Sequence, residues 1–231
     1  IDMFDTSLNA TPFLDMKREN TNLVLNTSYN HKFSARFTNK TGVTFTQMLY
    51  NMEMSLAPFV SQPLNVISMG SGHTSLLSAY TSNSIGIGNN FTLSLGLNAQ
   101  LLTLNKSWTL EPRIGMKWQA TSRSSFALAY GLHSRMEKMD VYYTQTPQTG
   151  DKLVNKDLDF TKANHFMLTF DYKISDDMIL KIEPYYQYLF HIPVEENSSF
   201  SIINYEEFYL DRILTNTGIA KNYGIDITLE Q

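Results

Sequence analysis

Three absences limit what this 231-residue chain can be. It has no cysteine, so it has neither a disulfide framework nor a thiolate metal site. It has no excess of basic residues, since 18 Lys and Arg stand against 22 Asp and Glu, and the net charge of −4 argues against a nucleic-acid partner. It has no run of about 18 apolar residues, which excludes a membrane-spanning helix.

Aromatic residues, in contrast, are abundant, with 13 Tyr and 14 Phe. The mean hydropathy of −0.23 does not exclude a membrane protein, because only alternate residues of a membrane β-barrel face lipid. The lack of cysteine is also compatible with a bacterial outer membrane, because such barrels close by hydrogen bonds alone.

The clearest pattern lies in the stretch 108–118, WTLEPRIGMKW. Side chains of a strand alternate between its two faces, so one face carries Trp108, Leu110, Pro112, Ile114, Met116 and Trp118, and the other carries Thr109, Glu111, Arg113, Gly115 and Lys117. The two indoles are ~33 Å apart along a strand, or ~25 Å in projection at a tilt of ~40°, which matches the apolar band of an outer-membrane barrel. The stretch predicts a transmembrane β-strand with lipid on one side and a wet lumen on the other.

Similar alternation recurs along the chain and predicts an all-β protein, an antiparallel meander of about nine long strands. Ile1–Met16 reads as a loop. The predicted strands are 19–30, 41–52, 74–83, 91–101, 108–118, 126–135, 165–174, 180–188 and 223–230. Pro112 and Pro184 interrupt two of these strands, which favours a β-bulge at each over an edge position.

The connections alternate between short and long. Turns near 31–36, 85–90, 121–124 and 175–177 are short; connections near 55–72, 137–161 and 190–218 are long, and the short LNKS segment is the exception. This is the arrangement of periplasmic turns and exterior loops in outer-membrane barrels. A soluble β-sandwich is the alternative, and strands of about 11 residues with aromatics at their ends argue against it.

The two ends suggest a partial barrel. The chain opens without an initiator Met, stops inside an expected strand, and has an odd strand number, whereas complete bacterial barrels have an even one. We therefore expect residues 1–231 to be a fragment of a larger barrel.

Several ordered stretches resemble the C-terminal barrel of TonB-dependent outer-membrane receptors, in particular the subgroup with a carboxypeptidase-regulatory-like domain. They are EPRIGMKW (111–118), SFALAYGLHS (125–134), the segment from LDFTKANHF to HIPVE (158–195) and GIAKNYGIDITLEQ (218–231). The resemblance covers most of the chain from about Thr41 and is strongest from Leu158 to Glu230.

This resemblance implies a 22-stranded barrel in a Gram-negative outer membrane, filled by a plug domain, that takes up a scarce nutrient with energy delivered through TonB. The implied substrates are iron chelates, cobalamins or glycans. The implied partners are outer-membrane lipid, TonB acting through a plug region, the small-molecule or glycan substrate and a surface lipoprotein, but no nucleic acid. The sequence departs from the family in having no plug, no TonB box and no aromatic-ended terminal strand.

No catalytic constellation stands out, so we expect no enzyme and no cofactor. The polar residues expected to face the lumen are Glu111, Arg113, Lys117, His133, Arg135, His165, Lys181 and Glu183. They would form either a polar track that contacts plug or solute, or an ordinary ladder of opposite charges. His133 and His165 are expected side by side near the outer mouth, where paired imidazoles suit a metal or ligand. No carboxylate has matching spacing, so we predict no metal site.

The two longest loops hold acidic and aromatic residues that could form a ligand-binding lip for sugars or cations. The candidates are Tyr142, Tyr143, Glu195, Glu196, Tyr205 and Glu206. The alternative is that these side chains are solvated or pack on their neighbours. Two further hypotheses stay open beside the receptor: a small passive pore or scaffold barrel, and an outer-membrane hydrolase. The hydrolase is disfavoured because no Ser, His and acid fall on one face near one rim.

Overall fold

A computed structural model of the chain describes residues 1–4, 6–145, 152–196, 198, 201, 203 and 212–231. Its main feature is a nine-stranded antiparallel sheet in which every strand pairs with the next along the sequence. The strands are β3 (Leu14–Ser34), β4 (Phe37–Leu56), β5 (Asn65–Ile87), β6 (Phe91–Leu102), β7 (Trp108–Gln119), β8 (Ser124–Arg135), β9 (Thr161–Lys173), β10 (Ile179–Glu195) and β11 (Leu214–Glu230). The predicted all-β meander is confirmed.

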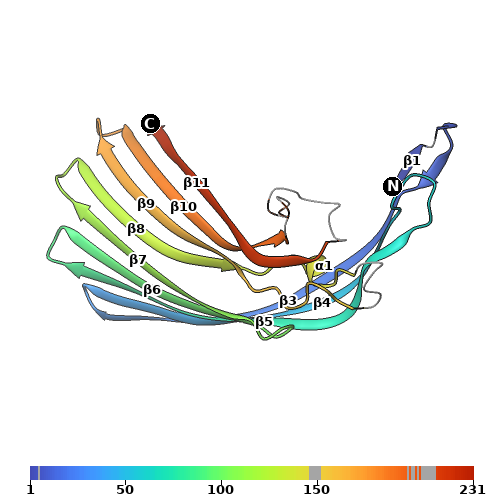
Figure 1. Cartoon of the computed structure of the whole chain (residues 1–231). Coiled ribbons are helices and arrows are strands. Elements are labelled where there is room, and N and C mark those ends of the chain that lie inside the picture. The colour runs from blue at the N-terminus through green and yellow to red at the C-terminus, as the bar shows by residue number, and fades with distance from the viewer. Residues whose placement is uncertain (5, 146–151, 197, 199–200, 202, 204–211) are drawn as a thin grey trace.

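The sheet is curved like part of a barrel wall, and the turns that join β3 to β4, β5 to β6, β7 to β8 and β9 to β10 lie at one rim (Figure 1). A small hairpin of β1 (Asp2–Phe4) and β2 (Ala10–Pro12) precedes the sheet, and a short helix, α1 (Met139–Tyr142), lies in the long β8–β9 loop. Across the described residues, no helix has the length and apolar character needed to cross a membrane.

The first three strands of the sheet are longer than predicted, with 21, 20 and 23 residues. The prediction that Ile1–Met16 is a loop is wrong, since β1, β2 and the start of β3 lie there. The predicted loops 55–72 and 190–218 are shorter than expected, because β5 begins at Asn65 and β10 continues to Glu195. These strand ends lack clean alternation, and it is pairing with a neighbouring strand that keeps them extended, as Leu14 with Leu56 shows.

The two strand prolines do not cause bulges, so that prediction is wrong. Pro112 lies opposite Leu97 of β6, and the β7–β8 ladder ends beside it at the pair of Arg113 and Gly131. Pro184 lies opposite Ile225 of β11, and the β9–β10 ladder skips two pairs there without changing register. A proline has no N–H to donate, so each strand loses pairing to one neighbour and continues.

The two faces of the sheet differ in character. Figure 1 places α1 on the concave side, and Tyr143, which follows α1, packs against Tyr50 of β4. The registers from β4 to β7 show that Thr109 and Glu111 of β7 lie on the same face of the sheet as Tyr50, which is the concave face. Both are buried, whereas Ile114 and the apolar residues alternating with it are 41–65% exposed on the convex face. The facing predicted for the tryptophan strand is confirmed.

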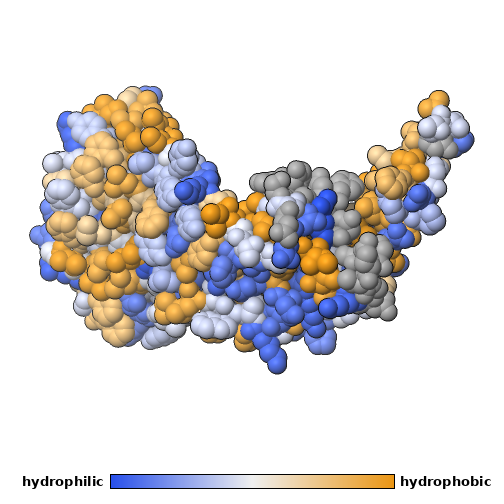
Figure 2. Space-filling view, viewed as in Figure 1, coloured by the Kyte–Doolittle hydropathy of each residue, from blue (hydrophilic) through white to orange (hydrophobic). Residues whose placement is uncertain are grey.

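Aromatic rings form a row on the convex face near the short turns. Phe91, Trp118 and Phe126 stack in sequence with centroids 5.8 Å apart, and Phe170 follows at 4.9 Å. Each ring comes from a different strand, β6 to β9. Figure 2 shows large apolar areas over this end of the sheet, with no second layer of structure on them. Such a row is typical of the aromatic girdle at a membrane interface.

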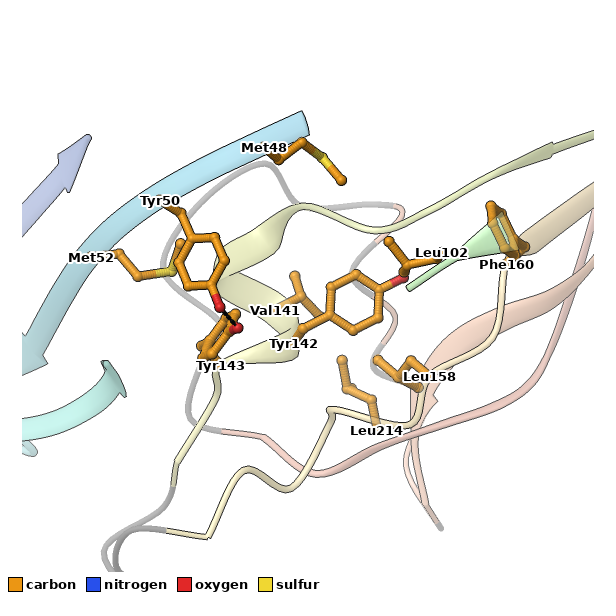
Figure 3. Close-up of a cluster of buried hydrophobic side chains, with 10 residues drawn as sticks. All are labelled: Met48, Tyr50, Met52, Leu102, Val141, Tyr142, Tyr143, Leu158, Phe160 and Leu214. Carbon is orange, nitrogen blue, oxygen red and sulfur yellow. Dashed lines mark hydrogen bonds between the residues drawn. The ribbon is translucent and has the colours of Figure 1, made fainter. Parts of the chain in front are cut away.

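The buried core lies on the concave face, under the β8–β9 loop. Residues 136–145 and 152–160 of this loop, here called the inner strap, cover the outer halves of β4 and β5. Figure 3 shows its apolar cluster, which consists of Met48, Tyr50, Met52, Leu102, Val141, Tyr142, Tyr143, Leu158, Phe160 and Leu214. Asp140 of the strap also pairs with Arg18 of β3 at 2.9 Å. Strands and strap therefore form one packed unit.

The two faces predict opposite tolerance to charge at adjacent positions. Ile114→Lys places an ammonium on the convex apolar face, and we expect a loss of about 2–4 kcal/mol of stability in lipid. Gly115→Lys is the matched control, because a Cβ there meets its nearest atom at an ordinary 3.8 Å on the wet side. Urea unfolding in lipid vesicles, followed by heat-modifiable gel mobility, measures both; equal destabilisation would contradict the assigned faces.

The strap predicts a stability change at alkaline pH. Burial raises the pKa of Tyr142 to about 12, above the ~10 of an exposed phenol. The neutral phenol is the folded form, so its stabilisation is complete below pH ~10 and is lost as pH rises through about 12, on the order of 3 kcal/mol in all. Phenolate absorbance should show a transition near pH 12 that Tyr142→Phe removes. A difference spectrum that titrates near pH 10 would show that Tyr142 is not buried.

Candidate functional site

Small residues line the middle of the concave face and leave a hollow of about 970 Å³. Its floor is formed by Ser82, Ser94, Gly96, Gly115, Ala129 and Gly131 from β5 to β8. Polar side chains at its border are Tyr80, Asn98, Arg113, His133, His165, Glu183, Tyr185, Gln187, Asn222 and Asp226. A hollow bordered by polar side chains, opposite an apolar convex face, is the arrangement expected of a barrel lumen.

Glu111 is the most buried charge on this face, with 1% of its side chain exposed. It accepts hydrogen bonds from Asn98 at 3.1 Å, from Gln100 at 2.5 Å and from the Ser134 hydroxyl, and it pairs with Arg113 at 3.0 Å. Ser134 reaches the carboxylate because the β7–β8 ladder has ended at Arg113. With four donors this buried carboxylate is saturated, as a stable structure requires.

A second group of charges lies closer to the short-turn rim. Lys117 is 3.8 Å from Asp171, and Lys181 is 3.0 Å from Glu183. Ser125 and Thr169 donate further hydrogen bonds to the two carboxylates, at 2.9 and 3.1 Å. These ion pairs form a ladder of opposite charges on the concave face. Such a ladder is the alternative to a polar track that contacts plug or solute. Arg135 is exposed at the end of β8.

His133 and His165 lie side by side on this face, as the sequence predicted. Their ring centroids are 4.7 Å apart and their planes make an angle of 45°. They lie on paired strands, with His165 opposite Gly131 and His133 opposite Ala163. Across the part of the chain that the structure describes, no group of three or more His, Asp or Glu side chains is arranged to hold a metal ion.

The loop residues expected to bind ligand take different positions. Tyr142 and Tyr143 are 1% and 7% exposed in the core of the inner strap, so the alternative of packing holds for them. They pack because Tyr143 fits over Gly70, where any side chain would collide with its ring. Glu195 pairs with Arg212 at 2.6 Å, and Glu196 is exposed. Tyr205 and Glu206 lie outside the described residues.

One polar cluster was missed by sequence reasoning. Asp159 lies 3.4 Å from both His191 and Lys162, and its backbone N–H donates to Asn216 at 2.8 Å. Asn216 in turn donates to the His191 carbonyl at 2.8 Å. The cluster depends on two register shifts on either side of Ile192, the first of which falls at His191, whose φ is 54°. No pattern in the sequence indicates a register shift at a residue other than glycine, so this cluster could not be predicted.

No family model and no curated protein matches the chain, but solved structures do. The outer membrane transporter YddB from Escherichia coli matches with a TM-score of 0.66 at 12% identity, over 93% of this chain and 31% of that one. The FrpB iron transporter of Neisseria meningitidis (F3-3 variant) matches at 0.61 and 15%, over 92% and 33%. The copper transporter OprC matches at 0.64 and 11%, over 94% and 36%.

The chain therefore spans about a third of the length of these transporters. The likeness is one of fold, and it covers the whole nine-stranded wall and not a single hairpin. Together with the apolar convex face and the polar concave one, it shows that this chain has the fold of the barrel wall of these transporters.

Proposed function

We propose that the chain is a large part of the barrel wall of a TonB-dependent receptor in a Gram-negative outer membrane, and that the receptor takes up a scarce nutrient. The candidate nutrients are iron chelates, cobalamins and glycans. The observation that carries the proposal is the division of one sheet into an uncovered apolar face with an aromatic row and a polar face with a hollow. An aqueous environment would not favour so much exposed apolar surface.

The inner strap supports a gated transporter over the alternative, a passive pore. It fills the concave side near the long-loop rim instead of leaving a free passage, and it is held to three strands. Ser68 of β5 forms a bridge with Thr144, Tyr50 of β4 contacts Tyr143, and Arg18 of β3 pairs with Asp140. A solute entering along this wall meets the strap first.

The partners follow from the two faces. The convex face suits outer-membrane lipid, and the small-residue floor of the hollow allows a plug domain to approach the wall closely. TonB would act through such a plug, and a surface lipoprotein would contact the long-loop rim. The proposal includes no enzymatic step, in keeping with the transporters whose fold the chain shares.

Growth tests the energised uptake. A deletion strain, grown on a panel of iron chelates, cobalamins and glycans as limiting nutrients, should fail on one class and recover when the gene is restored. Loss of TonB should cause the same failure. Uptake that persists without TonB, together with steady conductance of the purified protein in a planar bilayer, would identify a passive pore instead.

Cross-linking tests the strap, and the natural absence of cysteine makes the background clean. Ser68 and Thr144 are bridge partners, so Ser68→Cys with Thr144→Cys can form a disulfide that holds the strap to β5. We expect uptake to fall by about tenfold or more when this pair is oxidised and to return on reduction. Asn39→Cys with Asn83→Cys, opposite each other within the sheet, is the matched control. Full uptake by the oxidised strap variant would show that the strap need not move.

A further inference from the structure

The charge ladders explain most polar groups on the concave face, but they leave His133 and His165 unexplained. Both rings border the hollow. Within the described residues neither imidazole has a hydrogen bond or an ion pair. The two rings contact each other, and the charges of Arg113 and Glu111 act on His133. Two other histidines differ: the His31 ring contacts the Tyr29 hydroxyl at 3.1 Å, and His191 lies 3.4 Å from Asp159.

The pair depends on a glycine. His165 lies opposite Gly131, two residues from His133 on the same face of β8, so the two histidines are diagonal neighbours. A Cβ at position 131 would lie 2.7 Å from Nε2 of His133. The His133 ring therefore leans along its own strand, over the space that glycine leaves, and this brings it beside His165.

The spacing of the rings suits a shared metal ion. A transition metal binds imidazole nitrogen at ~2.0–2.1 Å, and the ring centre lies about 1.1 Å farther out. Two imidazoles that meet at one ion with an angle of about 90–110° thus have centroids about 4.5–5.2 Å apart. The observed separation is 4.7 Å. The angle of 45° between the planes is neither the parallel arrangement of a stacked pair nor the perpendicular arrangement of an edge contact.

A cation and a carboxylate both act on His133, and the cation, Arg113, acts more strongly than the carboxylate of Glu111. Continuing the β7–β8 register beyond Arg113 and Gly131 would put Glu111 opposite His133, so the carboxylate that seemed missing from the sequence lies on the adjacent strand. Glu111 is saturated by its four donors and paired with Arg113, so it is not a free ligand. Two neutral imidazoles in such a setting select borderline ions such as Cu²⁺, Ni²⁺ or Zn²⁺ over Mg²⁺ or Ca²⁺.

We propose that His133 and His165 together bind one divalent transition-metal ion of the Cu²⁺, Ni²⁺ and Zn²⁺ class on the inner wall. Each histidine gives one ring nitrogen, and water completes the coordination. With two protein ligands, the ion exchanges readily with the solution in the lumen. The proposal rests on the proposed function only in requiring that the concave face be wet.

Titration of the detergent-purified protein with Cu²⁺ alone tests the site. We expect one ion per chain, with the paramagnetic-resonance hyperfine pattern of two equatorial nitrogens. His133→Gln and His165→Gln should each lower the affinity by about tenfold or more. His73→Gln, at an exposed position of β5, is the matched control and should leave it unchanged. Affinity that is unchanged in both site variants would overturn the proposal.

Gly131→Ala provides the sharper test, because it leaves both ligands in place. The new methyl group would lie 2.7 Å from Nε2 of His133 and at an ordinary 3.5 Å from Cγ of Arg113, so the strand keeps its fold while the ring must move away. Weakened Cu²⁺ binding with normal heat-modifiable mobility supports a positioned pair; unchanged binding would mean adventitious capture by separate histidines and would overturn it. Neither measurement involves uptake. If Cu²⁺ binding fails the test while growth depends on TonB, only the metal site is wrong. If growth fails the test while Cu²⁺ binding passes, only the proposed function is wrong.

Discussion

The whole structure depends on one constraint: each backbone N–H and C=O of a strand must be satisfied by a neighbouring strand wherever water cannot replace the hydrogen bond. A meander in which every strand pairs with the next satisfies this along the sequence. The same pairing determines which side chains lie on each face of the sheet. Side chains alternate along a strand, and the register between two strands places opposite residues on the same face. Even Pro112 and Pro184, which cannot donate, leave the register of their strands unchanged.

The faces then divide the chemistry. Apolar and aromatic side chains remain uncovered on the convex face, whereas Glu111 on the concave face is buried with four donors. The loop that would otherwise lie in solvent turns inward and supplies the buried core that a single sheet lacks. The same residues therefore stabilise the strap and hold it against the concave face.

Much of the fold could be read from the sequence where alternation is clean, as in 91–101 and 108–118. The prediction failed where contacts with other segments, and not the local sequence pattern, determine the structure. β3 is longer than predicted because it pairs with β4 along its whole length. Tyr142 is buried because it packs on β4 and β5. The pairing of His133 with His165 was predictable from strand spacing. The position of Glu111 beside His133 was not predictable, because the sequence does not show where the pairing of β7 with β8 ends.

The unequal length of the strands has a consequence for the rim. β3, β4 and β5 have 20 or more residues, whereas β6, β7 and β8 have 12 each, and the brief segment 103–107 joins β6 to β7 at the long-loop rim. At ~3.3 Å per residue the longer strands extend about 25–35 Å farther along their own direction. The long-loop rim of the wall is consequently uneven, because it extends farther over β3 to β5 than over β6 to β8.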